Sequence, residues 1–396
     1  MGRVRQLGIV FDGNANLFAQ GDVIKGQVVV VVDGEKYPGL NNVKGIWVRF
    51  QGKAKTKWTT RSNNNTHTHS LKESYFDTYL VAFGTGKYRS DVKGLQVPMG
   101  RNSFPFQFQL PLQPLPPPFE GKYGYVRYRA KATVSLIRTF SNKTSKTEKL
   151  FSIVGPTVDL NAHHQAQEPV NYSEDIMDCC GCSSTPEMTI RFGLPKQGYV
   201  PGESIYLNGH VDNREKEERC VFTTDLIQRI TYRSAMHEKE KKHVLASGTL
   251  PVACPRGRVT DFALGPLRVP PVPASGLLGC EIIDIQYYVQ VEGSGYRCKF
   301  DVLIGTIPLR RALQVFTTIA TAPPSDTGQE MSERTGEPRV TAPPYEAPPP
   351  SYEEAVGVIE RIVQERNPED YFSEGQFVPR YPCFNLTVDM PSADRS

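Results

Sequence analysis

The 396-residue chain has no long apolar segment and little helical patterning. No stretch of about 18 apolar residues occurs, so the sequence predicts no membrane-spanning helix. Residues 1–10 lack the apolar core of a secretory signal peptide, and we therefore expect a cytoplasmic protein. Apolar residues at helical spacing are nearly absent from residues 1–155, which disfavours a helical fold.

The sequence also lacks the short motifs that accompany common catalytic sites. It contains no phosphate-cradling glycine loop, no HExxH zinc motif and no GxSxG nucleophile motif. The seven histidines are scattered, and two of them, His237 and His243, flank the charged run Glu238–Lys242, which is typical of a loop. We therefore predict that the protein is not an enzyme and has no cofactor.

The eight cysteines form no clear metal or disulfide pattern. Cys179, Cys180 and Cys182 lie close together, but zinc needs four ligands and no second cysteine pair lies near them in the sequence. Palmitoylation of this group beside a membrane is an alternative, whereas the simplest interpretation is an inert connector. Without a secretory signal, we expect reduced thiols.

Short apolar runs between many of the 32 prolines and 33 glycines indicate an all-β protein with many turns. Val28–Val32 is a continuous apolar run suited to a strand that is buried on both faces. Residues 47–58 and 126–134 alternate between apolar and polar side chains, as strands with one buried face do. A second set of strands is predicted at Ser204–Val211, Ile227–Tyr232, Gly248–Val252, Ile282–Val291 and Phe300–Ile304.

One internal repeat indicates that a single domain type occurs twice. Phe18–Gly26 resembles Tyr199–Ile205, each with a glycine turn, an acidic residue and a strand that enters the core at an isoleucine. This predicts two tandem immunoglobulin-like β-sandwiches. We place the first at residues 1–155, a polar connector at 156–185, the second sandwich at 186–310 and a mostly disordered tail at 311–396.

Charge is divided unevenly between the body and the tail. Residues 311–396 contain fourteen Asp or Glu, seven Arg and no Lys, a net charge of −7. Residues 1–310 contain 39 basic and 28 acidic residues, a net charge of +11. A basic body suits anionic partners such as phosphorylated peptides or lipid headgroups. Nucleic acid is not expected, because no aromatic and basic platform is evident.

Two rows of basic residues follow from the alternation. Lys53, Lys55 and Lys57 share one face of one strand, and Arg127, Arg129 and Lys131 share one face of another. If both strands belong to one sheet, the rows form a positive surface for anionic cargo or lipid. The alternative is an ordinary solvated strand face.

The tail carries a candidate ligand for WW domains. Pro349 and Pro350, followed by Ser351 and Tyr352, combine a polyproline II segment with an aromatic anchor, which together suit the groove of a WW domain. Pro379 and Tyr381 form a second, weaker candidate, since Val378 stands where a first proline would be expected.

Six motifs in order resemble the alpha-arrestins, also called arrestin domain-containing proteins. They are Gly100–Phe108, Phe119–Gly124, Gly198–Ile205, Gly279–Tyr288, Leu303–Pro308 and Ala347–Ala355. The resemblance implies two arrestin-like sandwiches and an adaptor that recruits HECT-type ubiquitin ligases through their WW domains. It implies that membrane receptors or transporters are ubiquitylated and sorted as cargo, with the adaptor at the plasma membrane and endosomes.

A redox or metabolic regulator that binds thioredoxin is the alternative from another functional class. The family includes the thioredoxin-interacting protein, which uses a cysteine in the general region of Cys254. The residues around Cys254, Leu250–Pro255, do not match that site. The adaptor interpretation is therefore favoured.

Overall fold

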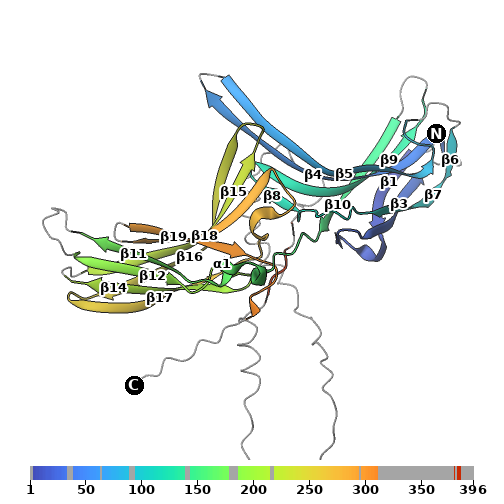
Figure 1. Ribbon diagram of the computed structural model, residues 1–396. Coiled ribbons are helices and arrows are strands. Elements are labelled where there is room, and N and C mark those ends of the chain that lie inside the picture. Colours follow the sequence, from blue (N-terminus) through green and yellow to red (C-terminus); the bar gives the residue numbers. More distant parts are fainter. Residues whose placement is uncertain are drawn as a thin grey trace, which may run out of the picture.

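The computed structural model describes residues 3–33, 39–62, 65–88, 94–138, 143–177, 186–214, 218–293, 296–310, 379 and 381–384. Two elongated β-domains lie roughly end to end and meet near the middle of the molecule (Figure 1). The described part of the chain contains one short helix, α1 (His164–Gln167), between the two domains, and 3-10 turns at Asp12–Asn14, Leu160–Ala162 and Ser275–Leu277.

The N-terminal domain is built from two sheets. The smaller sheet has the order β1 (Arg3–Phe11), β3 (Val23–Asp33) and β7 (Gly100–Gln109). The larger sheet has the order β2 (Leu17–Phe18), β10 (Lys143–Ile153), β9 (Gly124–Leu136), β4 (Gly39–Ser62) and β5 (Asn65–Gly84), with β6 (Leu95–Pro98) paired to β4 and β8 (Phe119–Gly121) paired to β9.

The C-terminal domain repeats this plan. Its smaller sheet has the order β11 (Val170–Ile176), β12 (Met188–Leu194), β14 (Ser204–Asn213) and β17 (Arg258–Arg268). Its larger sheet has the order β13 (Gly198–Tyr199), β19 (Tyr296–Ile304), β18 (Ile283–Gly293), β15 (Glu218–Arg233) and β16 (Glu238–Cys254). The prediction of an all-β fold with two sandwiches is confirmed.

Period-two alternation explains the core of the first sandwich. On β4 the side chains of Val48, Phe50 and Ala54 are buried, as are all the apolar residues that alternate along β9. Phe50 stacks on Phe108 with ring centroids 4.4 Å apart, so the two sheets interlock through aromatic rings.

The internal repeat corresponds to equivalent strands. β2 pairs in parallel with β10, and β13 pairs in parallel with β19. Gly21 and Gly202 adopt positive φ angles of 79° and 96° in the turns that follow, a conformation that glycine adopts without steric cost. Ile24 and Ile205 then enter the core with 0% exposure each.

Buried tyrosines also match between the domains. The Tyr128 hydroxyl on β9 donates a hydrogen bond to the carbonyl of Pro116 at 2.7 Å. The Tyr287 hydroxyl on β18 donates to the carbonyl of Pro273, also at 2.7 Å. Each bond fixes a proline-containing loop to the strand beneath it and satisfies a polar group that burial would otherwise penalise.

Two local expectations are corrected by the structure. Residues 170–176, placed in the connector from their polarity, form the edge strand β11, which pairs with β12. The charged run Glu238–Lys242 is not a loop but the first part of β16, which pairs with β15. Both segments lie at sheet edges, where strands carry more charge than core strands do.

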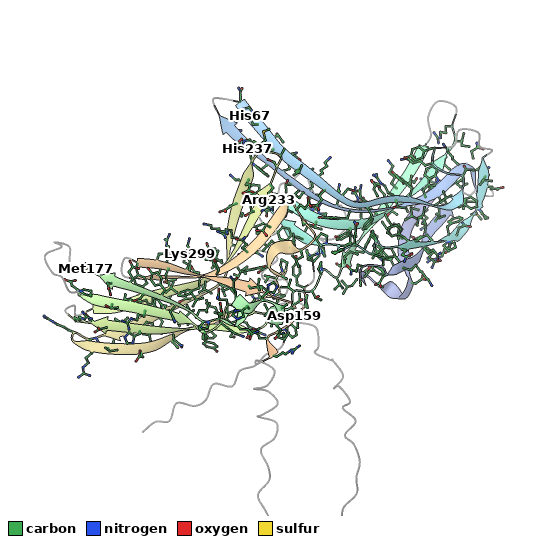
Figure 2. The ribbon with its side chains drawn as sticks, viewed as in Figure 1. His67, Asp159, Met177, Arg233, His237 and Lys299 are labelled. Atoms are coloured by element: carbon green, nitrogen blue, oxygen red, sulfur yellow. The ribbon has the colours of Figure 1, made fainter. Side chains whose placement is uncertain are left out.

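The two domains touch through the ends of long strands. The Thr56 hydroxyl of β4 donates to the carbonyl of Arg233 on β15 at 2.6 Å. At the tips of the β4–β5 and β15–β16 hairpins, the rings of His69 and His237 lie 4.4 Å apart, and Figure 2 labels His67, Arg233 and His237 in this region. Gly279 approaches the N-terminal domain at the Pro116 backbone.

Candidate functional site: a basic face and a bound C-terminal segment

The two basic rows predicted from alternation lie on neighbouring strands of one sheet. In the antiparallel register of β4 and β9, Lys53 lies opposite Arg127 and Arg49 lies opposite Lys131. Lys53 and Lys55 are half-buried and Lys57 is exposed. The two rows therefore lie side by side on one sheet, which is the condition under which they were expected to form a positive surface.

Arg127 differs from the rest of its row. Its side chain is 6% exposed, and its Nη2 atom donates a hydrogen bond to Oε2 of Glu120 at 2.8 Å. Its guanidinium also lies 3.8 Å from the ring centroid of Tyr125. The expectation that Arg127 faces solvent is therefore wrong, because Glu120 on β8 and Tyr125 cover it.

Burial and neighbouring positive charges both disfavour the charged form of Lys53. Burial lowers the pKa of its ammonium group to about 8, and the nearby charges of Arg129, Lys55 and Lys72 contribute to the decrease. A charged group that is partly desolvated beside like charges gains from an incoming anion. The arrangement thus favours occupation of this face by a negatively charged group.

A groove lies on the same sheet beside Lys53. Its volume is about 340 Å³, and its lining includes five cationic side chains, those of Arg49, Lys87, Arg129, Lys131 and Lys146. The lining extends onto β10, where Lys146 is exposed. We call this depression the basic groove.

Two carboxylates partly neutralise the basic groove. Nε of Arg49 donates to Oδ1 of Asp77 at 2.6 Å, and Glu148 lies 3.5 Å from Arg129 and 3.7 Å from Lys131. Positive charge remains in excess, and arginine forks beside lysine ammonium groups suit phosphate or carboxylate ligands. The groove has the chemistry of an anion-binding surface.

The second WW-domain candidate lies within the described residues, at the junction of the domains. Pro379 is buried, and the Tyr381 hydroxyl donates a hydrogen bond to the carbonyl of Pro118 at 2.9 Å. The principal WW-domain candidate, Pro349, Pro350 and Tyr352, lies outside the described residues, as do Cys179, Cys180 and Cys182.

Comparison with known proteins agrees with the two-domain architecture. Residues 7–161 match the arrestin (or S-antigen) N-terminal domain, and residues 184–309 match the arrestin (or S-antigen) C-terminal domain. Arrestin domain-containing protein 17 of Caenorhabditis elegans is 28% identical over 314 residues, which cover 76% of this chain and 70% of that protein. Arrestin domain-containing protein 4 of Homo sapiens is 24% identical over 397 residues, covering 96% and 85%. The chain belongs to the arrestin family, as an alpha-arrestin.

The thiol of Cys254 is poorly placed for redox chemistry in this alpha-arrestin. The residue ends β16 and is 2% exposed, with its Sγ atom 3.7 Å from the carbonyl oxygen of Val252. Reactive cysteines are partly exposed and lie in electropositive surroundings, and this one is buried in the core. The burial weighs against thioredoxin exchange at Cys254.

The described residues lack two other kinds of feature. No group of His, Cys, Asp or Glu within the described ranges is arranged to hold a metal ion. Within the same ranges, no helix is both long and apolar enough to cross a membrane.

Sequence reasoning missed part of the basic groove of the alpha-arrestin. Arg49 belongs to the same alternating face as Lys53 and was visible in that pattern. Lys146 joins the surface through the pairing of β10 with β9, and Lys87 follows the end of β5. Neither residue has a sequence signal of its own, since only the strand order of the sheet places them beside Lys131.

Proposed function

We propose that this alpha-arrestin is a non-enzymatic cytoplasmic adaptor that joins membrane-protein cargo to HECT-type ubiquitin ligases. The main support for this proposal is the sequence Pro349-Pro350-Ser351-Tyr352 in the tail of a chain with two arrestin domains. The consecutive prolines favour the polyproline II conformation that WW domains bind, so little ordering is needed on binding. The result would be ubiquitylation, endocytosis and transport of the cargo.

The arrestin body would supply the contact with cargo or membrane. Its basic groove and the neighbouring Lys53 present cationic groups to one side of the larger N-terminal sheet. Acidic or phosphorylated tails of receptors and transporters, at an anionic membrane surface, have the complementary charge. Peripheral association with the plasma membrane and endosomes follows from this role.

The adaptor role and the redox alternative predict different outcomes for the substitution Cys254→Ser. Replacing a buried core thiol with serine should lower stability without selectively removing a partner. Loss of one partner from a folded Cys254→Ser protein would favour the redox regulator instead.

Proximity labelling in cells tests the adaptor role. The wild-type chain, Tyr352→Ala and the control Ser351→Ala, which changes only the spacer between Pro350 and Tyr352, would be compared. We expect Tyr352→Ala to lose HECT-type ligases and keep membrane-protein cargo, while Ser351→Ala keeps both. Ligases that remain labelled by Tyr352→Ala as strongly as by the wild type would refute ligase recruitment through this motif.

A further inference from the structure

A short C-terminal segment, Tyr381–Phe384, is bound to both domains at once. The Tyr381 hydroxyl donates to the carbonyl of Pro118 in the N-terminal domain at 2.9 Å. Three residues later, the Phe384 amide donates to the carbonyl of Pro201 in the C-terminal domain at 2.8 Å. The segment therefore spans the junction, with a hydrogen bond to each domain.

The ring of Phe384 adds an apolar contact. It packs against a buried cluster formed by Leu160, Ala166, Val200 and Leu309, separate from the main core. Leu160 and Ala166 belong to the stretch that joins the two domains, whereas Val200 lies in the turn between β13 and β14. Phe384 thus covers a cluster whose members come from both the linker and the C-terminal domain.

The surface under the segment is shaped for close backbone approach. At Gly202, where φ is 96°, a Cβ atom would lie 1.8 Å from the carbonyl oxygen of Phe384. A side chain at this position is therefore incompatible with the bound segment. The turn itself is held by a hydrogen bond from the Gly202 amide to the carbonyl of Val269 at 2.7 Å.

The hydroxyl of Tyr381 is withdrawn from solvent. Burial raises its pKa well above the usual range, and the nearby Tyr287 and Glu120 contribute to the increase. A WW domain needs the tyrosine ring of its ligand in its own groove. The ring of Tyr381 cannot occupy the domain junction and a WW groove at the same time.

We propose that the domain junction is a binding site for the chain's own segment Tyr381–Phe384, and that this binding withholds Tyr381 from WW domains. While it is bound, the segment links the two arrestin domains through its contacts with both. A WW domain that binds Tyr381 removes this link. The second half of the proposal rests on the proposed WW-domain binding, whereas the first half does not.

Hydrogen exchange and WW-domain titration test the two halves separately. The full chain would carry Tyr352→Ala and also Tyr345→Ala, because Tyr345 follows another proline pair, Pro343 and Pro344. Tyr381 is then the tyrosine under test, and this chain would be titrated with a purified WW domain of a HECT-type ligase. A peptide of residues 370–390 is the unconstrained reference. Gly202→Ala and Phe384→Ala would each release the segment. Phe384→Ala changes no residue of the two domains and none of the motif Val378–Tyr381.

Gly100→Ala is the matched control. Gly100 has a φ of 93°, nearly that of Gly202, but no heavy atom outside its adjacent residues lies within 4 Å of its Cβ position. It therefore shares the backbone strain of Gly202→Ala without the clash with Phe384.

We expect the full chain to bind the WW domain roughly tenfold more weakly than the peptide does. The affinities of the two releasing variants should approach that of the peptide. The Phe384 amide should be protected from exchange in the wild type and in Gly100→Ala, and lose protection in Gly202→Ala. Equal affinity of full chain and peptide would overturn the withholding, and so would a peptide that does not bind. An unprotected Phe384 amide in the wild type would overturn the binding site itself.

Discussion

Arg127 and Arg129 occupy the same face of β9, yet the structure predicts that their loss destabilises the protein to very different extents. Arg127→Ala leaves the carboxylate of Glu120, whose side chain is 4% exposed, without its arginine partner, and removes the contact of the guanidinium with Tyr125. Breaking a buried ion pair by removing one partner costs about 3–5 kcal/mol. Arg129 is more exposed and lies 3.5 Å from Glu148, and loss of such a pair costs about 0.2–1 kcal/mol.

Urea unfolding followed by tryptophan fluorescence measures this difference. The two tryptophans of the chain, Trp47 and Trp58, both lie on β4, so their emission reports the N-terminal domain of the full chain. We expect a large decrease in the free energy of unfolding for Arg127→Ala and a small one for Arg129→Ala. Similar, small decreases for both variants would refute the assignment of Arg127 to a buried pair.

Four further outcomes are expected. Reversing the charges of Lys53, Lys55 and Lys57 to Glu should weaken binding to phosphatidylserine vesicles or phosphorylated cargo peptides at low salt, while each change alters the free energy of unfolding by about 0.5 kcal/mol or less; unchanged binding would eliminate this row as a site. Because the pKa of Lys53 is about 8, vesicle binding should also weaken as the pH rises through that value, and Lys53→Arg should remove this dependence. The pKa of His69 is lowered by burial and by the neighbouring His237 and His67, so the folded state resists protonation of this residue. Hydrogen exchange at the hairpin tips should therefore show a contact that is stable at neutral pH and weakens as the pH falls below about 6.5. A contact that does not depend on pH would contradict this. Since residues 311–396 contain no lysine, mass spectrometry of the 396-residue chain should find any lysine-linked ubiquitin on residues 1–310.

The sequence predicted the strands best where one face of a strand is buried and the other is not. β4 and β9 show this alternation through the buried Phe50 and Tyr128, and the strands predicted at residues 47–58 and 126–134 lie within them. The burial of Arg127 could not be predicted in this way, because alternation reports the face of a residue and not what covers that face. Its partner Glu120 lies on a three-residue strand with no periodicity to detect.

The position of Tyr381 at the domain junction depends on long-range contacts, which the sequence pattern does not reveal. Tyr381 and Pro118 are 263 residues apart in the sequence, and no local pattern connects them. The sequence identified Tyr381 only as part of an incomplete WW-domain motif, and the domain junction that binds it exists only after both sandwiches have formed. The motif containing Tyr352 stays a prediction from sequence and family.

Calorimetric titration of a tail peptide, residues 335–390, with an isolated WW domain of a HECT-type ligase tests the adaptor role most directly. Burial of the Tyr352 ring should contribute about 2 kcal/mol or more. We therefore expect Tyr352→Ala to weaken binding by more than about tenfold, and Tyr381→Ala to weaken it less. Equal affinities of the wild-type and Tyr352→Ala peptides would contradict the account.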